Sequence, residues 1–133
     1  MPIDGPIDEL RGRRILIVED ESLILLTIED IIEELGCEVA GTAMRAEAAI
    51  AIVASRPVDA ALLDVNLGVG QTSYPVAEAL AARGIPFAFL TGYGSGAVRP
   101  EYQDRPVLSK PVDQHALEAA LRGMMPAARL EEG

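Results

Sequence analysis

The sequence has one cysteine and no long apolar run, and each shortage excludes a class of protein. Cys37 has no partner for an intrachain disulfide bond, which is typical of proteins of the reducing cytoplasm. No apolar stretch approaches the roughly 18–20 residues that a membrane-spanning helix needs, so we expect no membrane segment. The N-terminus is acidic and interrupted by prolines, which is not the pattern of a signal peptide.

Positive charge is also scarce in this chain. It has 11 basic and 21 acidic side chains and a net charge of −10, which argues against a nucleic-acid-binding surface. Only one of the basic residues is a lysine, Lys110. Any chemistry that requires an amine would therefore use this one side chain.

The length of 133 residues predicts one domain with a core of its own. The first residues show no apolar periodicity, so we expect an N-terminal extension at 1–13. The folded domain is expected at 14–126 and a C-terminal tail at 127–133.

Short apolar runs alternate with helical patterns along the domain. The predicted strands lie at 14–18, 37–43, 58–64, 86–91 and 107–109, and the predicted helices lie near 24–35, 45–55, 75–84 and 113–124. This alternation predicts an α/β fold, a doubly wound, five-stranded parallel sheet with right-handed crossovers.

The segment between the fourth and fifth strands, residues 92–106, does not have a helical pattern. Inside a helix, each glycine lowers the stability by about 1 kcal/mol relative to alanine, and a proline lowers it by about 3 kcal/mol. The segment contains residues of both kinds and has no apolar face that would compensate for them. We therefore expect a fourth helix that is short or absent, with a turn or two near 98–104. The segment is either an ordinary helix shortened by poor propensity or a loop that changes conformation.

Polar side chains that could bind a ligand or take part in a reaction lie at the carboxyl ends of four predicted strands. Glu19 and Asp20 follow the first strand, Asp64 ends the third, Thr91 the fourth, and Lys110 follows the fifth. In open parallel sheets, ligands bind at this edge. Taken alone, Asp64 is also compatible with an ordinary turn residue that caps the following helix.

Three carboxylates brought together at one edge repel one another unless a cation lies between them. Oxygen ligands from Asp20 and Asp64 suit octahedral Mg²⁺. The loop after the first strand is acidic, whereas a dinucleotide-binding fold places a phosphate-binding loop there. The sequence therefore predicts a metal site that holds a phosphoryl group through the metal.

These residues resemble those of the receiver domains of two-component response regulators, over about Arg14 to Met125. The motifs that carry the resemblance are the acidic pair Glu19-Asp20, the lone Asp64, Thr91, and Lys110-Pro111 followed by Asp113. The resemblance implies a flavodoxin-like receiver fold.

By this resemblance, Asp64 accepts a phosphoryl group from a phosphohistidine of a sensor histidine kinase or histidine phosphotransfer protein. Mg²⁺ is bound by Asp20, Asp64 and the backbone carbonyl of Asn66, and Glu19 helps through a water molecule. A carboxylate is a competent nucleophile for such an acyl-phosphate intermediate.

Lys110 and Thr91 would contact the phosphoryl oxygens by the same resemblance. Positioning and charge neutralisation, which a divalent ion and a lysine supply, are the main requirements of phosphoryl transfer. The Lys110–Pro111 bond is expected to be cis, at a place where cis costs only about 0.5–1 kcal/mol.

Two positions depart from the common receiver pattern. Gly68 stands four residues after the acceptor, where many receivers have proline, and Val107 replaces the usual switch aromatic on the fifth strand. The run Phe89 to Tyr93, FLTGY, resembles the signature of the FAT GUY single-domain response regulators, with Leu90 where alanine is usual. That subgroup occurs in alphaproteobacteria, lacks a normal fourth helix, and works with sensor histidine kinases in stress signalling.

Without an aromatic at Val107, the nearest aromatic after Thr91 in the sequence is Tyr93, between Gly92 and Gly94. Glycines release the backbone from steric limits. We expect Thr91, Gly92 and Tyr93 to form a switch that responds to the phosphoryl group. The alternative is that Tyr93 is a fixed lid over the site.

Three classes of function remain open from the sequence. The first is a cytoplasmic, phosphorylatable signalling switch, monomeric or weakly dimeric, that is not a classical enzyme. The second is a receiver-like adaptor that is never phosphorylated, which would predict a missing acceptor, metal ligand or lysine. The third is a Mg²⁺-dependent phosphatase with an aspartate nucleophile, but such enzymes usually have a second aspartate at the position of Asn66.

Overall fold

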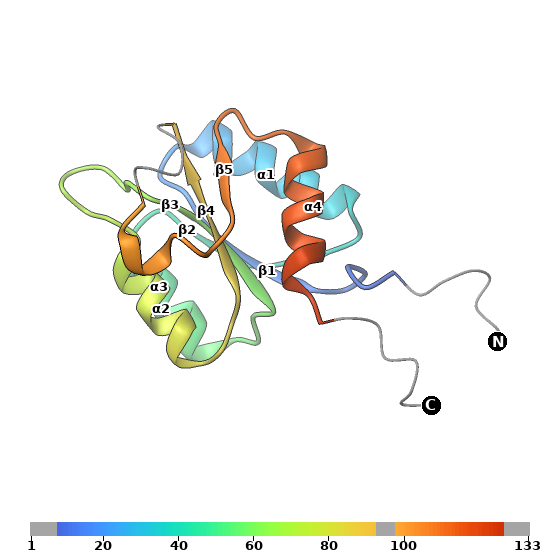
Figure 1. Cartoon of the computed structure of the whole chain (residues 1–133), viewed down its shortest axis with the longest axis horizontal. Helices are drawn as coiled ribbons and strands as arrows, with labels where there is room; N and C mark the ends of the chain where they lie inside the picture. The colour runs from blue at the N-terminus through green and yellow to red at the C-terminus, as the bar shows by residue number, and fades with distance from the viewer. Residues whose placement is uncertain (1–7, 93–97, 127–133) are drawn as a thin grey trace.

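The structure, a computed structural model, describes residues 8–92 and 98–126. Its centre is a five-stranded, fully parallel sheet in the order β2-β1-β3-β4-β5 (Figure 1). The strands are β1 (Arg14–Val18), β2 (Glu38–Ala43), β3 (Ala60–Asp64), β4 (Phe87–Thr91) and β5 (Val107–Ser109).

Helices cover both faces of the sheet, which confirms the predicted doubly wound α/β fold. Figure 1 shows α1 and α4 on one side of the strands and α2 and α3 on the other. None of the described helices is long and apolar enough to cross a membrane. Their bounds are α1 (Ser22–Glu34), α2 (Ala46–Ser55), α3 (Tyr74–Ala82) and α4 (Gln114–Met124).

The strands are continuous apolar runs because both of their faces are buried. In β1, Ile15 and Ile17 pack with the cluster under α1 and α4. The alternate residues Leu16 and Val18 pack with the cluster under α2 and α3. All four side chains are fully buried.

Local signals in the sequence mark the helix ends. Gly36 follows the last turn of α1 with φ +89°, a left-handed conformation that favours glycine after a helix. Asp113 caps α4, because its carboxylate accepts a hydrogen bond from the backbone N–H of Ala116 at 2.9 Å.

The crossover between β4 and β5 contains only one turn of 3-10 helix, Pro100–Tyr102, in its described part. This agrees with the prediction that the helix expected between β4 and β5, the fourth in a regular fold of this kind, is short or absent. The turn is nevertheless anchored to α3. The Tyr102 ring stacks on the Tyr74 ring with 5.8 Å between their centroids, and the backbone N–H of Arg99 donates a hydrogen bond to the Tyr74 hydroxyl group at 3.0 Å. Val98 is buried in the same core cluster.

The end of the expected N-terminal extension is part of the packed structure. Leu10 is fully buried in the cluster between α1 and α4. Asp8 binds the guanidinium group of Arg122 on α4, with 3.0 Å between Oδ1 and Nη1. An isolated leucine among charged residues has no periodicity, so the sequence pattern alone did not indicate its burial.

Candidate functional site

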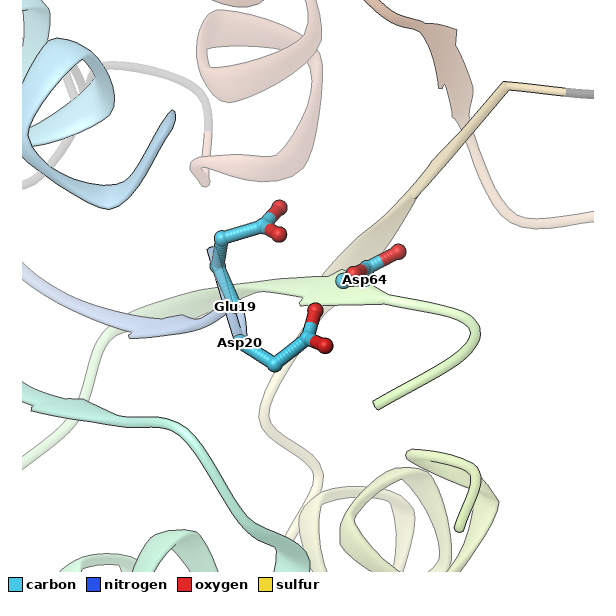
Figure 2. A group of neighbouring side chains, drawn as sticks. All are labelled: Glu19, Asp20 and Asp64. Carbon is cyan, nitrogen blue, oxygen red and sulfur yellow. The ribbon is translucent and has the colours of Figure 1, made fainter. Parts of the chain in front are cut away.

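Three acidic side chains meet at the carboxyl edge of the sheet. Glu19 and Asp20 directly follow β1, and Asp64 is the last residue of β3, the neighbouring strand. One carboxylate oxygen from each lies within 4.8 Å of the others, and Figure 2 shows the three side chains at the adjoining strand ends. Glu19 is 0% exposed and Asp64 5%, so two of these charges are shielded from water.

Lys110 supplies the positive charge of the cluster. Its Nζ lies 3.1 Å from Oε1 of Glu19 and 3.1 Å from Oδ1 of Asp64. Oε2 of Glu19 accepts a hydrogen bond from the backbone N–H of Glu21 at 3.2 Å. The Lys110–Pro111 peptide bond is cis, as expected.

Burial and repulsion shift the protonation of this cluster. Burial, followed by the negative charge of Glu19, raises the pKa of Asp64 to about 7, although Lys110 opposes the shift. Burial alone would lower the pKa of Lys110, but its hydrogen bond to Glu19 and the charge of Asp64 outweigh this and raise that pKa. In the metal-free protein, Lys110 therefore remains a cation while Asp64 is near its titration point at neutral pH.

An open pocket of about 470 Å³ lies over the cluster. Thr91, at the end of β4, lies in its wall and is 2% exposed, and its carbonyl accepts a hydrogen bond from the Lys110 N–H at 3.0 Å. Tyr93 lies outside the described residues. The pocket is lined by Asp20, Glu21, Asp64, Asn66, Gly68, Thr91, Gly92 and Lys110.

The donor set fits a divalent cation that prefers oxygen ligands. Three carboxylates face one another with a single lysine beside them. Oε1 of Glu19 is buried and accepts no hydrogen bond from the described residues, its contact there being the ion pair with Lys110. A cation with its water molecules would supply both the missing charge and a hydrogen-bond donor.

A sequence model of the response regulator receiver domain matches residues 15–122. The chain belongs to this family. Receiver domains are generally signalling switches and not classical enzymes, and they interact with histidine kinases or histidine phosphotransfer proteins.

Solved receiver domains resemble this one closely. SdrG from Sphingomonas melonis Fr1 is 46% identical, with a TM-score of 0.77 over 89% of this chain and 98% of SdrG. PhyR from Brucella abortus is 29% identical, with a TM-score of 0.76 over 88% of this chain and 50% of PhyR. The receiver domain of Erythrobacter litoralis PhyR is 25% identical, with a TM-score of 0.77 over 92% of this chain and 100% of that one. The comparison with curated proteins gave no match.

The structure of this receiver brings together the described residues that the sequence proposed for the site, from four separate segments. It adds two that sequence reasoning did not assign to the site, Glu21 and Gly68. Glu21 contributes its backbone N–H, a group that no side-chain pattern can indicate. The sequence did mark Gly68 as unusual, because many receivers have proline at this position. Its place in the site depends on its neighbours in three dimensions, which the sequence does not give.

Proposed function

We propose that this receiver accepts a phosphoryl group on Asp64 from the phosphohistidine of a sensor histidine kinase or histidine phosphotransfer protein. The observation that carries the proposal is the placement of Asp64: a nearly buried carboxylate 3.1 Å from the only lysine and beside two further acids. The carboxylate must be ionised to act as a nucleophile, and a cation beside it favours the ionised form of a buried acid.

The proposed transfer is a direct displacement at phosphorus. A carboxylate oxygen of Asp64 forms the new P–O bond while the P–N bond to the donor imidazole breaks. The electron pair of that bond stays on the imidazole nitrogen, which takes a proton from solvent. Lys110 and the Thr91 hydroxyl group are proposed to bind the oxygens of the transferred group, because both line the pocket next to Asp64.

Asp20, Asp64 and the Asn66 backbone carbonyl are the proposed ligands of Mg²⁺, with Glu19 acting through water. When bound, the metal would neutralise charge on the phosphoryl oxygens. Lys110 already neutralises part of the Glu19 and Asp64 charge without it. The residues of this chain therefore hold the acceptor in place before any donor arrives.

A protein donor is supported by the surface beside the pocket. Leu23 and Leu26 on α1 are 78% and 55% exposed, so a partner that covered them would bury apolar surface. Leu23 also lines an apolar groove that reaches Lys110. The groove is lined by Glu21, Leu23, Ile24, Thr27, Ile28, Lys110, Pro111 and Val112.

We also propose that the chain is a FAT GUY receiver that signals from the cytoplasm by protein contacts. The motif from Phe89 onward and the short crossover after β4 support this assignment. A PhyR structure from Bartonella quintana, 25% identical over 83% of this chain and 47% of that one, is named an anti-anti-sigma factor. The FAT GUY resemblance, whose subgroup works in stress signalling, is the ground for proposing a place in a stress-response phosphorelay.

Intact-mass measurement with acetyl phosphate and Mg²⁺ tests the central proposal. The wild type and the exposed control Asp104→Asn should each gain one phosphoryl group, and Asp64→Asn should gain none. Labelling of Asp64→Asn, or full labelling of the wild type after the metal is chelated, would contradict the proposal. Transfer from a panel of histidine kinases would then identify the donor.

A further inference from the structure

Gly68, in the loop between β3 and α3, lies directly against a proposed metal ligand. It has φ +80°, and a Cβ built on it would stand 3.1 Å from Oδ2 of Asp20. That distance is shorter than ordinary van der Waals contact, so a side chain here requires either the loop or the Asp20 carboxylate to move.

The loop is held in place on both sides of Gly68. The Leu67 N–H donates to the Gln71 carbonyl at 2.9 Å, and the Gln71 N–H donates to the Gly68 carbonyl at 2.8 Å. Leu67 is buried, and Val69 is kept at φ +43°, a conformation that a β-branched residue adopts only where its surroundings impose it. The loop therefore resists displacement, whereas Asp20 is a partly exposed side chain that can rotate.

We propose that Gly68 is a positioning residue: by having no side chain, it lets the Asp20 carboxylate remain in the acid cluster with Glu19 and Asp64. This inference rests on the proposed metal-dependent function, which it deepens. A methyl group at position 68 would turn Asp20 away from the cluster and weaken metal binding without removing any ligand.

The same loop contains a matched control, Gly70. It has φ +77°, almost the same backbone conformation as Gly68, but a Cβ built on it meets nothing within 4 Å. Gly68→Ala and Gly70→Ala therefore share the cost of placing alanine in a left-handed conformation. They differ in the contact with Asp20.

The test is a titration of the full chain with Mg²⁺ alone. The NMR shifts of the Asp64 and Val65 amides measure the binding. Gly70→Ala should bind Mg²⁺ as the wild type does, and Gly68→Ala should bind about 10-fold more weakly, the usual scale when a ligand loses its orientation. If the two variants bind Mg²⁺ with equal affinity, the inferred role of Gly68 is wrong, but the proposed function is not affected. A wild type that does not respond to Mg²⁺ would instead overturn the proposed function, and this inference with it.

If Gly68→Ala does not fold, a second pair of variants decides. Asp20→Ala removes the side chain that the new methyl group would meet. Thermal unfolding of Asp20→Ala, Gly68→Ala should then match that of Asp20→Ala, Gly70→Ala. If the former still unfolds at a lower temperature, the methyl group meets something other than Asp20 and the proposal is wrong.

Discussion

Lys110 Nζ lies 3.1 Å from Oδ1 of Asp64, although β5 and β3, the strands that lead into these residues, are not neighbours in the sheet. The lysine therefore reaches across the end of β4, where Thr91 stands. A carboxylate, an ammonium group and a hydroxyl group at the ends of three consecutive strands of the sheet are thus brought together at one edge.

We predict that Asp64→Asn stabilises the metal-free protein at pH 8. The folded-state pKa of Asp64, about 7, is above its ordinary value of 3.8, so the folded state holds this proton more tightly than the unfolded state. The wild type should lose stability as pH rises from 4 through 7, by about 1–3 kcal/mol, and Asp64→Asn should not show this loss. Urea unfolding at several pH values, with Asp104→Asn as control, measures it. A variant no more stable than the wild type at pH 8 would show that burial and repulsion do not destabilise the ionised Asp64 carboxylate.

The two acids after β1 should contribute unequally to metal binding. Asp20→Asn is expected to weaken Mg²⁺ binding more than Glu19→Gln, because only Asp20 is proposed as a direct ligand and Glu19 is already paired with Lys110 at 3.1 Å. Calorimetric or NMR titration with Mg²⁺ compares them. Similar losses in the two variants would argue against this division of roles.

We expect beryllofluoride, which mimics the phosphoryl group, to change the crossover after β4 as well as the acid cluster. Thr91 should move toward the bound group and shift Gly92, and the change should reach Val98 to Tyr102, where the crossover is attached to Tyr74. Backbone NMR shifts and amide exchange rates measure this. If residues 92–102 are unchanged while the Asp64 region responds, Tyr93 is better described as a fixed lid.

Leu10→Ala should destabilise the domain by about 2–5 kcal/mol, the usual cost of truncating a fully buried leucine. Leu23→Ala, at a site 78% exposed, is the matched control and should change stability by no more than about 0.5 kcal/mol. Chemical denaturation measures both. Equal effects would mean that residues 8–13 do not contribute to the folded domain.

The sequence by itself determined the order of the elements and the residues at their ends. Continuous apolar runs predict strands buried on both faces, and Gly36 and Asp113 mark helix ends through local backbone and capping effects. Because parallel strands share a carboxyl edge, the polar residues after them could be assigned to one site without coordinates. These features could be predicted because each depends on neighbours in the chain or on the topology alone.

Only the tertiary structure decided the contacts between residues that are distant in the chain and have no repeating pattern. Leu10 is buried because it packs in one core cluster with side chains of α1 and α4, and Tyr74 anchors the crossover because its ring and hydroxyl group meet Tyr102 and Arg99. The raised pKa of Asp64 depends on its burial and on the distance to Glu19. The closeness of Asp20 to the place that a Cβ on Gly68 would occupy is of the same kind, because it is set by packing in three dimensions and not by local sequence.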